Sequence, residues 1–317
     1  MPNINCCLCG SPEHELHFPA HDHISGEDFR VVRCSNCGLI FVNPQPPLDQ
    51  LGRYYPATHQ VSKPAAYERM DARPRIRDVK NLFLGKPGKI LDIGCGKGLF
   101  LAGLKGLGWQ AKGVELSETS GQYARSLGLD ICARPVEDCT FEPESFDVIT
   151  LFHSLEHIPN PTQTLQHIYG LLRPGGILLV EVPNAGSWYA GTFGENWFHC
   201  DVPRHLFHFT RDTLTKSIDL AGFRPEKLTT VNVQYDAFGA VQSLLNAVLS
   251  RKNLLNDFNT GETDLASLLH STHKWRDLAG LTLSELALAI GFPLFALADL
   301  ALLPWVEGGT LRVIAIK

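Results

Sequence analysis

The sequence predicts an α/β fold in which helices cover a mostly parallel sheet, with a cysteine-rich module before it and a helical insertion near its end. An apolar run at residues 90–93 is followed by glycines at spacing two and then by leucines at helical intervals. Two further runs, at 145–152 and 172–180, contain short apolar stretches typical of strands buried on both faces. Two Cys-x-x-Cys-Gly motifs lie near the N-terminus. These observations predict a module at 1–45, a linker with helices at 46–84, and a larger domain at 85–317.

The composition is that of an ordinary soluble protein, because 44% of the 317 residues are hydrophobic and 19% are charged. The net charge of -5 at pH 7 and a pI of about 6.2 argue against a general affinity for nucleic acid. The first ten residues show neither a basic segment nor an apolar core, so we expect no secretory signal and a cytoplasmic location. The nine cysteines are therefore expected to be reduced thiols that are available to bind metal.

Four cysteines of the N-terminal module form two knuckles, namely Cys6, Cys9, Cys34 and Cys37. The glycine after each pair lets the turn expose backbone amides to the sulfur atoms. Thiolates at this spacing can surround Zn²⁺ tetrahedrally, and the pattern resembles a zinc ribbon. Because four thiolates leave no open coordination position, we expect the metal to be structural. The alternative is that the four residues are buried or redox-active thiols. If metal is bound, Cys7 could compete with Cys6 as a ligand.

The segment between and after the knuckles carries weaker signals. Its histidines are expected in a solvated loop, and they are His14, His17, His21 and His23. Residues 43–47 predict an extended exit, followed by a short helix at 48–55 and an amphipathic helix at 65–84. Tyr54 and Tyr55 are expected either to close over a ligand or to pack between modules.

The stretch 89–100 combines a strand, a glycine turn and a helix. This arrangement brings backbone N–H groups and a helix N-terminus up to a polar ligand. Gly94, Gly96 and Gly98 suit it because a Cβ atom would block the approach of the ligand. A second apolar run ends at Glu115, about twenty residues after the turn, where a carboxylate can accept the hydroxyl groups of a ribose.

Several stretches taken in order resemble the class I S-adenosylmethionine-dependent methyltransferases. They are the glycine turn, residues 113–116, the strand at 145–152, and the turn and strand at 172–180. The loop Glu-His-Ile-Pro-Asn-Pro at 156–161 is similar to one branch of this family. The resemblance covers residues 65–232 and the last strand. It implies a Rossmann-like sheet of seven strands with helices on both faces.

The resemblance also implies S-adenosylmethionine as the cofactor. Asp92 would reach the ammonium of the methionyl group, and the amides of residues 94–98 would meet its carboxylate. Glu115 would accept both ribose hydroxyls, while backbone of Val136 and Glu137 would hold the adenine, since Pro135 stands where many relatives carry an aspartate. The predicted cofactor-binding residues are Asp92, Gly94, Cys95, Gly96, Gly98, Glu115, Leu116, Val136, Glu137, Phe152 and His153.

The loop at 153–161 is predicted to border the transferred methyl group, because the carboxyl ends of parallel strands face the ligand crevice. His157 is a candidate general base, since an imidazole titrates near neutral pH. In the alternative interpretation, Glu156 and His157 only order the loop by hydrogen bonds.

Residues 195–210 form the most site-like segment outside the cofactor motifs, with three histidines, one arginine and four aromatic residues. His205 is the first candidate for the general base. Arg204 is a candidate for binding a phosphate or carboxylate of the acceptor, and His199 and His208 are candidate acceptor-binding residues. The segment is similar to that of zinc-ribbon-bearing sugar C-methyltransferases, which carry a Glu-His pair here; Arg204 replaces that glutamate.

Two other interpretations of this segment are open. His199, Asp201, His205 and His208 could together bind a metal ion. The segment could also be a loop fixed by aromatic packing, with Thr210 capping a helix at 211–221.

A helical insertion is predicted between the last two strands, at about 234–309. Helices are expected at 238–249 and 265–278, and residues 286–306 are nearly all apolar and long enough to span a bilayer. A membrane span here is incompatible with the predicted fold, because the segment lies between two strands of one sheet, the last of them at 310–316. We therefore expect burial in a lid or in a homo-oligomer interface, with peripheral docking on a membrane surface as the alternative.

The function predicted from the resemblance is methyl transfer to a small-molecule acceptor, with a histidine as general base. Sugars, nucleotide-sugars and glycolipid intermediates are the leading acceptors. The alternatives are a methyltransferase acting on RNA or protein, and a non-catalytic protein that keeps the cofactor fold. The net charge of -5 and the lack of an Asn-Pro-Pro-Tyr-type motif after the fourth strand argue against nucleic acid.

Overall fold

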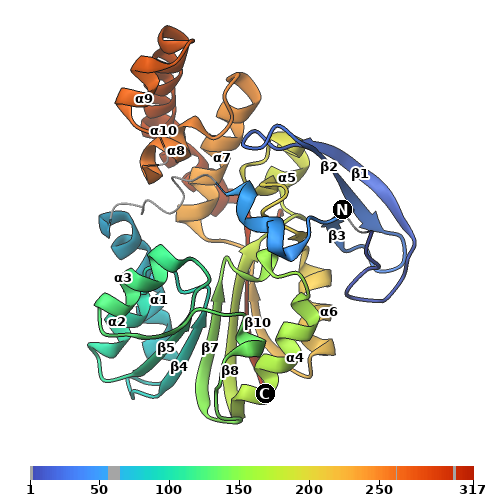
Figure 1. Cartoon of the computed structure of the whole chain (residues 1–317), viewed down its shortest axis with the longest axis vertical. Helices are drawn as coiled ribbons and strands as arrows, with labels where there is room; N and C mark the ends of the chain where they lie inside the picture. Colours follow the sequence, from blue (N-terminus) through green and yellow to red (C-terminus); the bar gives the residue numbers. More distant parts are fainter. Residues whose placement is uncertain (1–2, 56–64, 262, 303–304) are drawn as a thin grey trace. The chain divides into compact units, whose positions relative to one another are not determined.

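The computed structural model describes residues 3–55, 65–261, 263–302 and 305–317, and Figure 1 shows its elements. The chain divides into two compact units, which we call the sheet unit (60–182, 215–228 and 312–317) and the ribbon unit (1–59, 183–214 and 229–311). Each unit is assembled from three segments of chain, whereas the predicted boundaries at residues 45 and 84 follow the order of the sequence.

The sheet unit contains a seven-stranded sheet with the order β10-β11-β8-β7-β4-β5-β6. Its apolar runs form the central strands, because residues such as Ile90, Leu91 and Ile149 are fully buried. The strands are β4 (Lys89–Ile93), β5 (Gln110–Val114), β6 (Asp130–Cys132), β7 (Phe146–Phe152), β8 (Leu172–Pro183), β10 (Arg224–Thr229) and β11 (Thr310–Ile316). The predicted Rossmann-like sheet of seven strands is confirmed.

The chain order reverses at β4. This strand pairs in parallel with β5 on one side and with β7 on the other, so that Asp92 lies opposite both Gly113 and Thr150. In open parallel sheets a ligand binds beyond the carboxyl ends of the strands at such a reversal. The glycine turn leaves β4 at this end of the sheet.

Helices of the sheet unit pack on these strands to form one core. In Figure 1, α1, α2 and α3 accompany β4 and β5. Their bounds are α1 (Ala65–Leu82), α2 (Leu99–Lys105), α3 (Glu118–Ser126) and α4 (Pro161–Leu171). The core joins buried residues of helices and strands, among them Val79, Ile90, Leu101, Leu104, Val148 and Leu179.

The N-terminal module forms a four-stranded antiparallel sheet in the order β1-β2-β3-β9. Its strands are β1 (His14–His21), β2 (Asp28–Cys34), β3 (Ile40–Val42) and β9 (Phe207–His208). The expectation of a solvated loop between the knuckles is wrong for His14, His17 and His21, because these residues lie in β1. β9 was not predicted. It joins the histidine-rich segment to the strand that follows the second knuckle, so that His208 lies opposite Ile40.

Short helices complete this part of the ribbon unit. They are η1 (Leu48–Tyr54), α5 (Trp188–Phe193), η5 (Gly194–Asn196) and η6 (Phe198–Cys200). Tyr54, predicted to close over a ligand or to pack between modules, is 1% exposed, and its ring packs against Phe29. The Tyr54 hydroxyl donates a hydrogen bond to Glu27 at 2.9 Å, so this tyrosine belongs to the core of the ribbon unit.

The insertion is helical, as expected, but its helices differ from the prediction. α7 (Val233–Val248) begins earlier than predicted, α8 (Leu254–Thr260) was not predicted, and α9 (Leu265–His270) is a short helix. α10 (Lys274–Leu302) joins the end of the second predicted helix to the apolar stretch in one helix of 29 residues.

The apolar stretch is not buried, contrary to the expectation of a lid. Leu286, Ile290, Leu294 and Leu297 of α10 are all more than half exposed. Within the described residues, α10 is the one helix whose length and mean hydropathy of 1.8 would suit a membrane span, and only 11% of its apolar window is buried.

Candidate functional site

The glycine turn follows β4 and is shaped by three residues with left-handed backbone, Gly94 (φ 75°), Gly96 (φ 53°) and Gly98 (φ 71°). A Cβ atom on Gly94 would come within 2.6 Å of Ser154, and one on Gly98 within 2.4 Å of Leu129. A Cβ atom on Gly96 would meet no atom within 4 Å. Two of the glycines therefore allow close packing of the protein, and the third borders open space where a ligand can approach.

The amides of this turn hold its shape. Gly94 and Cys95 both donate to the carbonyl of Val114, at 2.9 and 3.1 Å, and Gly98 donates to the carbonyl of Cys95 at 2.9 Å. These N–H groups are thus already used within the protein. The predicted contact between them and a methionyl carboxylate stays a prediction that this geometry does not favour.

Glu115 links the turn to the next helix. Its carboxylate accepts hydrogen bonds from the N–H of Gly96 at 2.8 Å and from the N–H of Ser117 at 2.7 Å. Each carboxylate oxygen can accept a further hydrogen bond. The half-buried Glu115 can therefore still accept ribose hydroxyls, and the adjacent Leu116 offers an apolar surface that is 63% exposed.

Asp92 ends β4 in a buried position, with 4% exposure. Thr150 on β7 donates a hydrogen bond of 2.6 Å to its carboxylate. Burial raises the pKa of Asp92 to about 7, against the opposing effects of the Thr150 hydroxyl and the positive charge of Arg75. A ligand ammonium would favour the ionised form of this carboxylate, as the predicted role requires.

The predicted adenine loop forms η3 (Val136–Asp138), with Val136 buried. The carboxylate of Glu137 accepts a hydrogen bond from Thr164 on α4, so this side chain is engaged within the protein. A disulfide between Cys132 and Cys139 closes the loop at its two ends. The expectation that all nine cysteines are reduced is therefore wrong for this pair, because β6 and the loop bring the two residues within 6.2 Å at their Cα atoms.

Phe152 and His153 end β7 beside the glycine turn. Ser154 joins the two segments, because its hydroxyl donates to the carbonyl of Ile93 at 2.7 Å. His153 has a left-handed backbone (φ 53°) and places its ring between two buried carboxylates. Its Nε2 lies 3.2 Å from Glu181 and its Nδ1 lies 3.7 Å from Glu156.

These carboxylates determine the charge of His153. Burial alone would lower the pKa of His153, but the hydrogen bonds and charges of Glu156 and Glu181 raise it to about 9. Burial would likewise raise the pKa of Glu181, whereas His153, Arg75 and Arg312 lower it to about 2. Near neutral pH the pair therefore consists of an imidazolium and a carboxylate.

Two arginines complete this charged cluster, which the sequence did not reveal. Arg75 of α1 lies 3.4 Å from Glu181 and 4.3 Å from the ring centre of Phe152. Arg312 of β11 lies 3.3 Å from Glu181 and 2.6 Å from Asp78. The residues of this cluster come from α1, from β8, from β11 and from the segment 153–156. These stretches are separated in sequence, so no local motif could have identified the cluster.

The loop after His153 forms η4 (Leu155–His157). Glu156 is 1% exposed and faces His153, while His157 is half-buried and its N–H donates to the carbonyl of Ser154 at 3.1 Å. The position of Glu156 agrees with the interpretation that it orders the loop. The role of His157 as a base stays a prediction.

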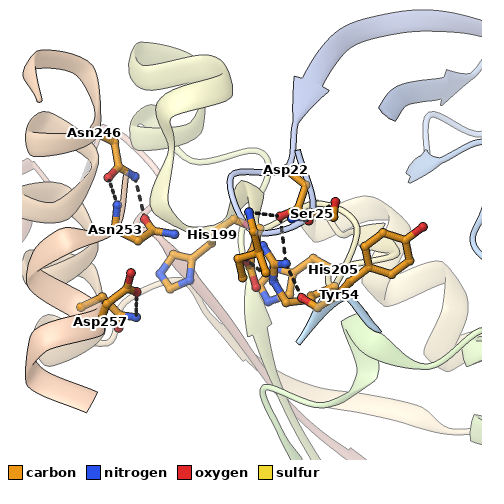
Figure 2. Close-up of polar contacts among 12 residues, drawn as sticks. Asp22, Ser25, Tyr54, His199, His205, Asn246, Asn253 and Asp257 are labelled. Carbon is orange, nitrogen blue, oxygen red and sulfur yellow. Dashed lines mark hydrogen bonds and ion pairs between the residues drawn. The ribbon is translucent and has the colours of Figure 1, made fainter. Parts of the chain in front are cut away.

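The histidine-rich segment belongs to the ribbon unit, and Figure 2 shows His199 and His205 there. Nδ1 of His205 lies 2.8 Å from the carbonyl oxygen of His199. Because a carbonyl only accepts, Nδ1 carries the proton in this hydrogen bond. In the neutral ring the lone pair is then on Nε2, which is the atom that can accept a proton.

Arg204 is held by acidic groups. Its guanidinium donates to Asp201 at 2.8 and 2.9 Å, to Asp22 at 3.0 Å, and to the carbonyl of Tyr54 at 2.7 Å. Burial would lower the pKa of Arg204, but the two carboxylates raise it further above its usual value. A side chain that is 4% exposed and neutralised in this way ties the segment to the ribbon, and binding of an acceptor anion by it stays a prediction.

The ring of His208 lies beside that of His205, with 6.3 Å between the ring centres, whereas His199 packs on another part of the ribbon unit. A Cβ atom on Gly239 of α7 would lie 3.1 Å from Nε2 of His199, so this glycine lets the ring pack closely on α7. Among the described residues, the four ligands of the alternative metal site do not gather as a group of nearby donor atoms, and Asp201 is instead paired with Arg204.

The four cysteines of the two knuckles do gather, and their sulfur atoms all lie within 4.8 Å of one another. Cys6 and Cys37 are 3.4 Å apart, and Cys9 and Cys34 are 3.5 Å apart. The N–H groups of Gly10 and Gly38 donate to the carbonyls of Cys6 and Cys34, so both knuckles have the same turn. Four convergent thiols are the donor set that Zn²⁺ prefers in structural sites.

Comparison with known proteins identifies the family. A family model described as a methyltransferase domain matches residues 67–228, which is just over half of the chain. The chain belongs to this methyltransferase domain family. The matched residues contain the glycine turn, Glu115 and the charged cluster apart from Arg312.

Curated relatives match part of this chain. A protein named ubiquinone biosynthesis O-methyltransferase from Glaesserella parasuis is 37% identical over 120 residues, which are 34% of this chain and 50% of that protein. One with the same name from Bordetella bronchiseptica is 37% identical over 155 residues, which are 46% of this chain and 63% of that protein. The chain thus spans between half and two thirds of the length of these relatives.

Among solved structures, a proposed sarcosine dimethylglycine methyltransferase from Galdieria sulphuraria superposes with a TM-score of 0.52. It is 11% identical and covers 78% of this chain and 85% of that one. At this identity the similarity shows the fold alone. The predicted resemblance to class I S-adenosylmethionine-dependent methyltransferases is confirmed at the level of family and fold.

Proposed function

We propose that this chain binds S-adenosylmethionine and transfers its methyl group to a small-molecule acceptor. The observation that carries the proposal is the position of Asp92 and Glu115 near the ends of adjacent parallel strands, beside a turn that is open at Gly96. Two carboxylates placed in this way fit a ligand with an ammonium group and vicinal hydroxyl groups. Membership of the methyltransferase domain family supports the same cofactor.

The residues of this site have separate tasks. Asp92, whose pKa burial raises to about 7, would hold a positive group of the ligand. Glu115 would accept hydroxyl protons while it keeps the amides of Gly96 and Ser117. When bound, S-adenosylmethionine would supply a methyl group on a positively charged sulfur. The protein would then orient donor and acceptor, which contributes much of the rate acceleration in such reactions.

A base is needed to remove the proton of the acceptor. We propose His205 for this role because the carbonyl of His199 fixes the proton on its Nδ1, so that in the neutral ring Nε2 is the basic nitrogen. His157 is the second candidate. His153 is unsuited, because the carboxylates around it raise its pKa to about 9 and its ring is protonated at neutral pH.

For the acceptor we propose a hydroxyl group of a sugar, nucleotide-sugar or glycolipid intermediate. The names of the curated relatives support oxygen as the methylated atom, and they make an intermediate of ubiquinone biosynthesis the second candidate. The net charge of -5 argues against an RNA acceptor. A protein acceptor and a non-catalytic cofactor-binding protein are the remaining alternatives.

We also propose that Cys6, Cys9, Cys34 and Cys37 hold one structural Zn²⁺. Four thiolates would fill its coordination sphere, so the metal would stabilise the module and take no part in the reaction. The expected location of the enzyme is the cytoplasm.

Transfer of a labelled methyl group tests the proposed function. The full chain would be incubated with methyl-labelled S-adenosylmethionine and with nucleotide-sugars, glycolipids and quinone precursors in turn. With the acceptor that becomes labelled, His205→Ala should lower turnover by about 100-fold or more, the usual range for a general base. The matched control is His17→Ala, an exposed histidine of the same unit. Full turnover of His205→Ala would assign the base elsewhere, and His157→Ala would be the next variant.

A further inference from the structure

The helix α10 presents a continuous apolar face that the rest of the described chain does not cover. We define this apolar face by its large side chains, which are 47–65% exposed: Leu283, Leu286, Ile290, Leu294, Leu297 and Leu300. A surface of this kind marks an interaction site, because scattered leucines are common on proteins but contiguous rows are not. The opposite side of the helix is buried by its own neighbours, as shown by Leu281 and Ser284.

The apolar face carries no exposed charge along most of its length. Between Leu286 and Leu302 the only ionisable residue is Asp299, which is 3% exposed and accepts a hydrogen bond from the hydroxyl of Tyr189. Glu285 is the exposed acid that precedes this stretch. A surface that must face water would be expected to carry charged residues at such positions.

The exposed positions of this helix also form a broad surface. At 100° per residue, those between 282 and 301 cover an arc of about 180°, with Glu285 at one edge. A helix that pairs with a second helix in a coiled coil needs only a narrow seam at two positions of every seven. The width of the apolar face therefore favours a surface that is itself continuous and apolar, such as the acyl region of a lipid layer.

Tryptophan residues lie near both ends of the apolar face. Trp275 and Trp305 are each 77% exposed, although tryptophan is usually largely buried in a soluble protein. Indole rings concentrate at the boundary between lipid and water, where an apolar body and a polar N–H group are both satisfied. Trp275 lies in the first turn of α10 and Trp305 follows the end of the helix, so the two residues flank the apolar face in sequence.

Exposed basic residues stand beside the first of these tryptophans. Lys274 and Arg276 flank Trp275, and the exposed His270 and His273 lie shortly before them. The nearest acid, Asp277, is 6% exposed and accepts a hydrogen bond from Ser271. Cations near an interfacial helix are attracted by anionic lipid headgroups.

We propose that α10 docks the protein on the surface of a bilayer that contains anionic lipids, with the apolar face inserted among the headgroups and upper acyl chains. The helix would lie in the interface and not cross it, because its other side packs against α7, α8 and α9, and its sequence leads into β11 of the sheet. This inference goes beyond the proposed function and does not rest on it. A second copy of the chain on the same face is the competing outcome.

The experiment is flotation of the full chain with vesicles of phosphatidylcholine alone and of phosphatidylcholine with phosphatidylglycerol. We expect binding to the anionic vesicles. Ile290→Glu combined with Leu294→Glu should weaken it by about tenfold or more, because the two substitutions replace large apolar side chains that the lipid would bury with charged ones. The matched control is Leu84→Glu, at a leucine that is 89% exposed elsewhere in the chain and should bind as the wild type does.

A second variant separates the electrostatic contribution. Lys274→Glu combined with Arg276→Glu should reduce the preference for phosphatidylglycerol and leave the apolar face intact. Failure of the wild type to bind either vesicle would overturn the proposal, as would equal binding by the Ile290/Leu294 variant. If the wild type forms a concentration-dependent dimer in solution and this variant stays monomeric, the apolar face would be assigned to a second copy of the chain. Each variant should keep the circular-dichroism spectrum and the cooperative thermal unfolding of the wild type, which shows that it is folded without reference to the proposed function.

Discussion

Arg204 shows that a charged residue in a site-like segment can serve the structure of that segment. Sequence pattern suggested an anion-binding arginine, because arginine often recognises phosphate and carboxylate groups. The carboxylates it meets are instead Asp22 and Asp201 of the protein itself, on either side of a buried guanidinium. Its partner Asp22 is 182 residues away in sequence, so pattern alone could not have revealed the pairing.

This arrangement predicts a large effect of Arg204→Ala on stability. Removal of the guanidinium would leave Asp22 buried at 0% exposure without its cation, which typically costs about 3–5 kcal/mol. Urea unfolding should show a loss of this size. Arg224→Ala removes an arginine that is 75% exposed, and it should change stability by less than about 1 kcal/mol. Equal stability of Arg204→Ala and the wild type would contradict the structural role.

The pair of His153 and Glu181 predicts a pH dependence of stability. His153 has a pKa raised from 6.5 to about 9, so its contribution is complete below pH 6.5 and is lost as the pH rises through 9. Glu181 has a pKa lowered from 4.5 to about 2, so its contribution is complete above pH 4.5 and is lost toward pH 2.

Thermal unfolding between pH 8 and pH 10 tests this pair, because Asp92, with a pKa of about 7, is mostly ionised in that range. The wild type should lose stability across pH 9. His153→Gln should show a smaller change over the same range, since it has no proton to lose. His273→Gln, at an exposed histidine, is the control and should follow the wild type. A decline that is identical in all three proteins would contradict the proposed pairing.

At the scale of elements, the strands and turns with strong local patterns were predicted well. The short apolar runs of β4 and β7 and the glycine turn specify their structure within a few residues. β9 and η4 could not be predicted, because each is short and depends on pairing or packing with distant residues. The same holds for α10, where a uniformly apolar composition lacks the periodicity that would separate its buried side from its exposed side.

The disulfide of Cys132 and Cys139 predicts that the adenine loop is sensitive to reduction. The bond closes the loop that contains Val136 and Glu137 and limits the conformations open to it. Cys139→Ser should therefore bind S-adenosylhomocysteine a few-fold more weakly than the oxidised wild type. A reductant should weaken the wild type to the same extent and leave the variant unchanged. Equal affinities of the variant and the oxidised wild type would contradict this role of the bond.

At the scale of the whole molecule, each compact unit is built from segments that are not consecutive in sequence. The ribbon unit takes in residues 183–214 and the insertion, although the sequence placed both within the larger domain. Composition and motifs identify the zinc-ribbon-like module and the methyltransferase domain. They cannot show that Asp22 contacts Arg204, or that Arg75 and Arg312 both contact Glu181, since such pairs form only when the complete chain folds.

The ribbon unit should depend on metal. Native mass spectrometry should find about one Zn²⁺ per chain, held by the four thiolates. Removal by a strong chelator should lower the unfolding temperature, because binding energy of a structural metal contributes to folding. Cys34→Ser should lose the metal, whereas Cys7→Ser should keep it. A folded wild type without zinc would contradict the metal site.

The most direct test of the central claim is calorimetric titration of the full chain with S-adenosylhomocysteine. The proposed site predicts micromolar affinity for the wild type, and a loss of about tenfold or more in Glu115→Ala, which removes the carboxylate beside Gly96. Glu118→Ala, three residues along in the first turn of α3, is the matched control and should bind normally. Absence of binding by the folded wild type, or equal affinity of Glu115→Ala, would contradict the cofactor site on which the proposed methyl transfer rests.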